Sequence, residues 1–331
     1  MTADIAGRFA PTPSGRMHLG NIFCALLVWL SIRKAGGRVI LRMEDLDPDR
    51  TRRDCAEKLE ADLRFLGLDW DEGGSLGGPF GPYFQSERTA LYEEALELLR
   101  DRGQLYPCFC SRAQLHAAEA PHAADGDVIY DGRCRRLSPE EAAALAQSRR
   151  PSIRLRVPSE IFRFVDGHYG VQEQNLARDC GDFILRRADG VFAYQLAVAV
   201  DDAAMGITQV VRGRDLLSST PRQIYLLQLL GARPPEYCHA PLLLAPDGRR
   251  LSKRDADLGL DALRERGLTA ADIVGRLACA AGLLERPEPA MPRELLSGFA
   301  WEKIPREDIR LPAVWFGNEK TGEAGQWCIP H

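Results

Sequence analysis

The sequence predicts an α/β protein with a Rossmann-like, doubly wound parallel sheet, a cysteine-rich insertion and a helical C-terminal region. Short apolar runs alternate with helical patterns over much of the chain, which is typical of βαβ units. A stretch rich in Cys, His and Gly interrupts this alternation, and helical patterns dominate after the last apolar run. We therefore divide the chain into a first half of the sheet domain (1–105), the insertion (106–155), a second half of the sheet domain (156–245), and a basic loop with the helical C-terminal region (246–331).

The opening of the chain predicts one βαβ unit. A strand at Arg8–Ala10 leads into a turn-rich segment, Pro11–Gly20, and then into an apolar helix, Asn21–Ala35, that ends at two glycines. A second apolar strand, Val39–Met43, closes in the acidic run Glu44–Asp47. Strands joined in this way are parallel and have a right-handed crossover.

The later elements extend this sheet and cover it. The predicted helices are Asp54–Leu66, Thr89–Arg102, Pro139–Gln147 within the insertion, and Thr220–Leu230 behind a Ser-Ser-Thr-Pro start. The predicted strands are Phe183–Arg187, Ala193–Val200 and Ile207–Val211. We expect the sheet to resume with these strands after the insertion. The chain then becomes mainly helical to about Leu284, and the stretch Trp301–His331 has no assigned role.

Composition excludes several classes of protein. The net charge of -4 is not that of a wholly basic protein that coats nucleic acid, although it leaves room for a local basic face. No apolar run approaches the roughly 20 residues of a membrane span, and Met1–Arg8 lacks the pattern of a secretory signal. The nine cysteines are expected to be thiols or metal ligands before they are disulfides. We expect a cytoplasmic protein that acts as a monomer, with no membrane partner.

The turn between the first strand and the first helix predicts a nucleotide site. Gly15 and Gly20 allow a ligand to approach the backbone, the helix start presents N–H groups and a positive dipole end, and His18 can donate to a phosphate oxygen. This arrangement suits a nucleoside triphosphate. Taken alone, the same residues are also compatible with a tight turn capped by a histidine.

A basic segment far downstream offers a second cationic group. Arg249–Asp255 follows the turn Pro246–Gly248 and contains Lys253. A loop that delivers Lys253 to a leaving pyrophosphate would stabilise developing negative charge. The alternative is a solvated basic loop, which is the usual role of a run of Lys and Arg.

Together, the two segments resemble the HIGH and KMSKS motifs of class I aminoacyl-tRNA synthetases. His18–Asn21 matches the first motif, although it ends in Asn rather than His, and Leu251–Lys253 matches the second, although an Arg precedes it in place of a Lys. Within that class, Arg8–Gly20, Arg42–Asp47 and Val210–Leu216 resemble the glutamyl and glutaminyl branch. The resemblance spans about residues 8 to 260, and its specificity comes from the order and spacing of the motifs.

The resemblance implies that the chain activates L-glutamate with ATP and Mg²⁺. The catalytic residues that it carries over are His18 and Lys253, and these two would bind ATP together with Gly20. The residues that it carries over for glutamate are Arg8, Phe9, Ala10, Pro11, Thr12, Glu44, Tyr194 and Arg212.

The chemistry of four of these residues suits a glutamate site. Glutamate brings two carboxylates and one ammonium group, so its pocket needs cations and at least one anion. Arg8 and Arg212, each at the end of a predicted strand, suit the carboxylates, and Glu44 suits the ammonium group. Tyr194, on the predicted strand Ala193–Val200, would add a hydroxyl. Which arginine binds which carboxylate stays open, and without the motifs these residues would be ordinary ion pairs and a core tyrosine.

The insertion contains a candidate zinc site. Three thiolates in a short, loop-rich stretch suit a structural, tetrahedral zinc ion. The thiols are those of Cys108, Cys110 and Cys134. On chemical grounds His116 and His122 are the default candidates for the fourth ligand, whereas the resemblance points to Tyr130. The alternative is a group of unliganded, buried cysteines.

The resemblance also bears on the acceptor of glutamate. Only 254–331 follows the loop lysine, which is shorter than the anticodon-binding half of a conventional glutamyl enzyme, and we expect no anticodon-binding domain. A short form of this branch transfers glutamate to the queuosine base at the wobble position of tRNA(Asp), and the resemblance implies this acceptor. The alternatives are a truncated enzyme that charges the 3′ end of tRNA(Glu), another adenylyltransferase of the superfamily, and a non-catalytic RNA-binding paralogue.

Overall fold

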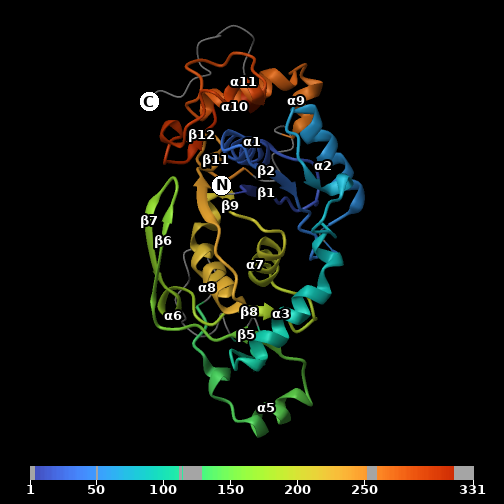
Figure 1. The fold of residues 1–331 in the computed structure, drawn as a ribbon, viewed down its shortest axis with the longest axis vertical. Helices are drawn as coiled ribbons and strands as arrows, with labels where there is room; N and C mark the ends of the chain where they lie inside the picture. Colours follow the sequence, from blue (N-terminus) through green and yellow to red (C-terminus); the bar gives the residue numbers. More distant parts are fainter. Residues whose placement is uncertain (1–3, 50, 112–113, 115–128, 252–258, 317–331) are drawn as a thin grey trace.

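A seven-stranded sheet forms the centre of the molecule (Figure 1). The structure is a computed structural model that describes residues 4–49, 51–111, 114, 129–251 and 259–316. In spatial order the strands are β3 (Glu72–Gly73), β2 (Arg38–Leu41), β1 (Ala6–Phe9), β9 (Gln209–Gly213), β10 (Glu236–Ala240), β6 (Ile161–Asp166) and β7 (Gly170–Asn175). Neighbouring strands are parallel except for β6 and β7, which form an antiparallel hairpin at one edge. The predicted α/β class and parallel sheet are confirmed.

Helices pack on both faces of the sheet. The helices of the described residues, including α5 of the insertion, are α1 (Leu19–Lys34), α2 (Arg53–Phe65), α3 (Thr89–Asp101), α5 (Pro139–Ala146), α6 (Leu176–Asp179), α7 (Tyr194–Ala204), α8 (Thr220–Leu230), α9 (Leu260–Glu265), α10 (Ala270–Ala280) and α11 (Pro292–Leu295). Helix α1 is apolar on nearly every side because it lies between the sheet and the C-terminal helices α10 and α11 (Figure 1). Helices α7 and α8 lie on the other side of the sheet from α1. Of these described helices, none has both the length and the apolar character needed to cross a membrane.

Short 3₁₀ helices join several of these elements. They are η1 (Gly74–Leu76), η2 (Gln85–Glu87), η3 (Arg133–Arg136), η4 (Arg214–Ser219), η6 (Trp301–Lys303) and η7 (Ala313–Phe316). Two of them carry residues of the sites described below: η3 lies in the insertion, and η4 follows β9 directly.

The insertion takes part in a separate antiparallel sheet. Its strands are β4 (Leu105–Cys108) and β5 (Ser152–Leu155), and β8 (Ile184–Arg186) joins them from the second half of the sheet domain. This sheet and α5 lie at the end of the molecule opposite to the C-terminal helices (Figure 1). A small parallel pair, β11 (Leu243–Leu244) and β12 (Ile309–Arg310), ties the C-terminal region back to the end of the sheet domain.

Two strand predictions in the second half were wrong. The segment Ala193–Val200 is not a strand, because α7 runs from Tyr194 to Ala204. A short apolar run fits a buried helix as well as a buried strand, and here the alanines favour the helix. The strand Ile184–Arg186 exists, but it pairs with β5 of the insertion rather than with the main sheet. The hairpin β6–β7, which was not predicted, extends the main sheet instead.

Candidate active site

The candidate site lies where the strand order of the main sheet reverses. Strand β1 pairs with β2, which follows it in the chain, and on its other side with β9, which comes far later. In open α/β sheets, ligands bind beyond the carboxyl ends of the strands at such a point. Arg8 lies in β1, Arg212 lies in β9, and Glu44 follows β2. The sheet therefore places these three residues at or just beyond the carboxyl ends of three adjacent strands.

Arg8 is held by a buried acid that the sequence analysis did not single out. Its Nε donates to Oδ1 of Asp202 in α7 at 3.1 Å, and Nη1 of Arg42 donates to the same oxygen at 2.7 Å. Burial alone would raise the pKa of Asp202, but Arg8 and Arg42 outweigh it, so this pKa lies below its usual value. Asp202 is thus an ionised anchor for the two arginines.

Glu44 lies at the margin of this charge network. Its Oε1 accepts from Nη2 of Arg42 at 3.3 Å, and its side chain is 11 % exposed. Burial raises the pKa of Glu44, and Arg42 and Arg8 oppose that rise only in part. A further cation beside Glu44, such as an ammonium group, would stabilise its ionised form.

Arg212 differs from Arg8 because neutral groups hold it. Its Nε donates to Nε2 of His239 at 3.0 Å, its Nη1 donates to Gln223 at 2.8 Å, and its Nη2 donates to Thr220 at 2.8 Å and to the Leu216 carbonyl at 3.3 Å. Arg212 is buried, and no carboxylate among the described residues forms an ion pair with it. A buried cation without a counter-ion is costly, so this position favours an anionic ligand.

Tyr194 joins this group from an unexpected element. It is the first residue of α7 rather than part of a strand, and the helix brings its phenol into the electrostatic range of Glu44, Arg212 and Arg8. Burial raises the pKa of Tyr194, and the Glu44 carboxylate adds to the rise. The phenol therefore stays protonated and can donate a hydrogen bond. The structure thus brings together the four polar residues among the eight that were predicted for glutamate.

The predicted nucleotide turn leads into the N-terminus of α1. His18 is the N-cap: its Nδ1 accepts from the Gly20 N–H at 3.1 Å, and the Asn21 side chain accepts from the His18 N–H at 3.3 Å. Because Nδ1 is an acceptor, the neutral ring carries its proton on Nε2 and is a donor there. The capping role of His18 is therefore present, and its contact with a nucleotide phosphate stays a prediction.

A pocket of about 480 Å³ lies in front of this turn. It is lined by Pro11, Thr12, Ser14, Gly15, Arg16, Met17, His18, Asn21 and Leu59. Phe9 ends β1 and packs into the core, and Ala10 connects it to Pro11. The Pro11 carbonyl accepts from the Glu44 N–H at 3.0 Å, which fixes the turn beside the glutamate candidates.

The basic loop of the second motif is described only at its two ends. Lys253 lies outside the described residues, which stop at Leu251 and resume at Gly259. Gly259 forms a β-bridge with His18, and the Leu260 N–H donates to the Met17 carbonyl at 3.2 Å. The chain that follows the second motif is thus attached to the turn of the first motif.

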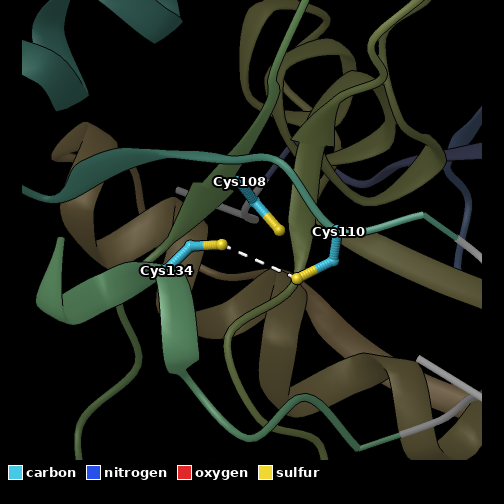
Figure 2. A group of neighbouring side chains, drawn as sticks. All are labelled: Cys108, Cys110 and Cys134. Carbon is cyan, nitrogen blue, oxygen red and sulfur yellow. Dashed lines mark hydrogen bonds between the residues drawn. The ribbon is translucent and has the colours of Figure 1, made fainter. Parts of the chain in front are cut away.

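The cysteines of the insertion form a compact group. Cys108 ends β4, Cys110 follows it, and Cys134 lies in η3; their three sulfur atoms lie within 4.8 Å of one another and point toward a common centre (Figure 2). The Cys110 and Cys134 sulfur atoms are 3.6 Å apart. The Tyr130 hydroxyl lies 3.6 Å from the Cys108 sulfur and 3.8 Å from the Cys110 sulfur. Adjacent ligands of a tetrahedral zinc with Zn–S of about 2.3 Å are about 3.8 Å apart, so these donors fit a metal ion.

The charges around this group are compatible with a bound cation. Burial raises the pKa of Cys110 to about 12, with the negative charge of Cys108 adding to the rise. Burial likewise raises the pKa of Tyr130 well above its usual value. The Arg154 guanidinium lies 3.8 Å from the centre of the Tyr130 ring. Burial would raise the pKa of the Cys108 thiol, but the charge of Arg154 and its hydrogen bond to Cys108 outweigh burial and lower that pKa. A divalent cation would relieve the crowding of several acidic groups. His116 and His122 lie outside the described residues.

Sequence reasoning missed three buried residues that support the site: Arg42, Asp202 and His239. A signal existed for the first two. Arg42 is a cation directly after the apolar strand β2, and Asp202 with its neighbour Asp201 closes the apolar run of α7, where buried acids need partners. His239 gave no signal, because its role depends on the pairing of β10 with β9.

Comparisons with known proteins agree with this geometry. Residues 4–278 match the family described as tRNA synthetases class I (E and Q), catalytic domain. The chain is 54 % identical over 312 residues to a protein of Symbiobacterium thermophilum named glutamyl-Q tRNA(Asp) synthetase, covering 93 % of this chain and 96 % of the relative. It is 51 % identical over 320 residues to a protein of the same name from Nitratidesulfovibrio vulgaris, covering 96 % of this chain and 99 % of the relative.

A solved structure has the same fold. The glutamate tRNA ligase of Elizabethkingia meningosepticum, in complex with its amino acid, superposes with a TM-score of 0.81 at 30 % identity. The match covers 95 % of this chain and 68 % of the solved chain.

Proposed function

Because the chain belongs to the class I tRNA synthetases of the glutamate and glutamine branch, and is therefore a ligase, we propose that it activates L-glutamate with ATP and transfers the glutamyl group to the queuosine base at the wobble position of tRNA(Asp). The observation that carries the choice of amino acid is the buried cation of Arg212, which has no anionic partner among the described residues. A substrate carboxylate would supply that partner.

Glutamate would be held by charge and hydrogen bonds at the switch point of the sheet. Arg212 and Arg8 would receive its two carboxylates, and Glu44 would receive its ammonium group. Arg8 is already anchored by Asp202, so glutamate would meet it in a fixed position. The Tyr194 phenol, kept protonated by burial, would add one donor. Which arginine receives which carboxylate stays open.

Activation would proceed by in-line displacement at the α-phosphate of ATP. An oxygen of the glutamate α-carboxylate forms a bond to the α-phosphorus while the bond to pyrophosphate breaks, which gives glutamyl-adenylate. We assign the triphosphate to the pocket in front of α1, where His18 donates through Nε2–H and the start of the helix contributes its dipole. Mg²⁺ and Lys253 would balance the charge of the leaving pyrophosphate.

Transfer would then require a hydroxyl of the acceptor beside the adenylate. The hydroxyl oxygen attacks the glutamyl carbonyl, its proton is released, and AMP leaves. We propose that the acceptor nucleoside enters a pocket of about 500 Å³ that begins directly after Arg212, between η4 and the hairpin β6–β7. Its lining combines an aromatic ring, amides, a hydroxyl, carboxylates and guanidinium groups, which suits a nucleobase taken out of a loop. The residues with these groups are Phe164, Gln172, Gln174, Ser218, Glu173, Asp179, Asp215, Arg214 and Arg250.

The choice of queuosine in tRNA(Asp) rests on the relatives. Two proteins named glutamyl-Q tRNA(Asp) synthetase match the chain over 96 % and 99 % of their own lengths. The alternative acceptor is the 3′ end of tRNA(Glu), which the likeness to a glutamate tRNA ligase supports at lower identity.

The cysteine group would hold a structural zinc ion. Cys108, Cys110, Cys134 and Tyr130 would be its ligands, and the ion would fix the strand end of β4 to η3. The zinc would stabilise the insertion and take no part in glutamate activation.

Glutamate-dependent exchange of pyrophosphate into ATP tests the proposed activation. L-Glutamate should stimulate exchange, whereas L-glutamine should not, because its neutral amide removes one of the two carboxylates that Arg8 and Arg212 would receive. Equal stimulation by both amino acids, or exchange without any amino acid, would contradict the assignment of the pocket.

A further inference from the structure

A chain of three buried side chains crosses three neighbouring strands and ends at Arg212. Asp166 is the last residue of β6, His239 lies in β10, and Arg212 lies in β9. His239 and Arg212 are direct partners in the strand register. The Asp166 carboxylate contacts Nδ1 of His239 at 2.6 Å, and Nε of Arg212 contacts Nε2 of His239 at 3.0 Å. All three side chains are buried.

The contacts fix the protonation of the imidazole. The Nε of an arginine always carries a hydrogen and can only donate, so Nε2 of His239 must be the acceptor. The ring proton is then on Nδ1, where it is donated to Asp166. His239 is therefore a neutral imidazole with a single allowed tautomer, and Asp166 selects that tautomer. Asp166 itself is fixed by the backbone N–H groups of His168 and Tyr169, at 3.0 and 2.9 Å.

The neutral imidazole of His239 orients Arg212 without offsetting its positive charge, which a carboxylate in its place would do. Arg8 is held by the charged Asp202, which offsets much of its positive charge. Arg212 is held by an imidazole, an amide, a hydroxyl and a carbonyl, which orient the guanidinium without neutralising it. These four contacts use four of the five N–H groups of an arginine, so among the described residues one N–H, on Nη1, has no acceptor.

We propose that His239, held by Asp166, is a positioning residue that orients Arg212 for a substrate carboxylate and preserves its positive charge. This inference rests on the proposed function, because it takes Arg212 to bind glutamate. The carboxylate of Asp166 lies behind the ring, where it sets the tautomer of His239 rather than forming an ion pair with Arg212.

Two substitutions of His239 separate positioning from general support of the fold. The amide oxygen of His239→Gln can occupy the place of Nε2 and accept from Arg212. The shorter His239→Asn can still donate to Asp166 but cannot reach Arg212. We expect His239→Asn to raise the KM for glutamate about tenfold or more, the usual effect of losing a hydrogen bond to a charged group. The KM for ATP should stay within about twofold, and His239→Gln should recover most of the loss.

Arg212→Gln, measured beside these variants, distinguishes a failure of the proposed glutamate pocket from a failure of the positioning role of His239. If Arg212→Gln leaves the KM for glutamate unchanged, the proposed glutamate pocket fails. If Arg212→Gln raises that KM but His239→Asn does not, only the positioning role fails. A rise in both the glutamate and ATP constants of His239→Asn, without recovery in His239→Gln, would also overturn it, because that pattern indicates a disturbed fold.

A spectroscopic measurement on the unmodified protein covers the case in which the variants do not fold. Nitrogen NMR of protein labelled in histidine distinguishes a protonated ring nitrogen from an unprotonated one. We expect His239 to be a neutral histidine whose proton is on Nδ1 at pH 7. Its signal is assigned by its loss in His239→Gln. If that variant does not fold, the signal is assigned by its nuclear Overhauser contact to Tyr237, whose ring is stacked on that of His239. A charged ring, or a proton on Nε2, would refute the inference.

Discussion

Replacing Asp202 by Asn should destabilise the protein strongly. The Asp202 side chain is 2 % exposed and contacts two arginines, at 3.1 Å from Arg8 and 2.7 Å from Arg42, whose side chains are 4 % and 0 % exposed. Asparagine keeps the size of the side chain but removes its charge, so one cation remains buried without compensation. Breaking a buried pair in this way costs about 3–5 kcal/mol of unfolding free energy. Urea denaturation at pH 7 measures the loss, provided the slope with urea stays unchanged.

A matched control is available on the surface. Glu93 pairs with Arg186 at 3.0 Å, and these side chains are 42 % and 35 % exposed. Glu93→Gln should change the unfolding free energy by no more than about 1 kcal/mol. If Asp202→Asn costs no more than Glu93→Gln, the network around Arg8 does not support the fold as argued. A folded fraction of Asp202→Asn should also bind glutamate more weakly, since Arg8 has lost its anchor.

Three further outcomes are expected. Lys253→Ala should lower glutamate-dependent pyrophosphate exchange about a hundredfold or more, the typical loss for one preorganised charge, and a near-normal rate would remove Lys253 from the reaction. Metal analysis should return about one zinc per chain, lost in Cys134→Ser; folded wild-type protein without metal would refute the site. Burial lowers the pKa of His239 from 6.5 to about 4; the positive charge of Arg212 adds to this lowering, and Asp166 opposes it. As the pH falls, the imidazole therefore becomes protonated in the unfolded chain before it does in the folded protein. The unfolding free energy should therefore drop by about 3 kcal/mol between pH 7 and pH 4, measured by urea titration, and an equal drop in His239→Gln would contradict this origin.

The predictable part of the site comes from residues at strand ends. The positions of Arg8, Glu44 and Arg212 follow from short apolar strands that end in charged residues, because parallel strands align their carboxyl ends at one edge. Tyr194 lies near these residues but on another element than predicted, since the run Ala193–Val200 fits a buried strand and a buried helix equally well. Only packing against the sheet selects the helix.

The supporting residues could not be predicted, because they depend on which strands become neighbours. His239 supports Arg212 only because β10 lies between β9 and β6, and no local pattern encodes that order. The hairpin β6–β7 escaped detection for a different reason. Phe162 and Phe164 point inward, while Ile161 and Val165 are exposed on the opposite face, so β6 lacks the polar alternation of a half-buried strand.

The identity of the acceptor tests the central claim most directly. Radiolabelled glutamate and ATP are supplied with tRNA(Asp) that contains queuosine, with tRNA(Asp) that lacks it, and with tRNA(Glu). A fourth sample contains the queuosine tRNA(Asp) without its terminal adenosine. We predict labelling of the two samples that contain queuosine, whether or not the terminal adenosine is present. Labelling of tRNA(Glu), or labelling that requires the terminal adenosine, would contradict the account.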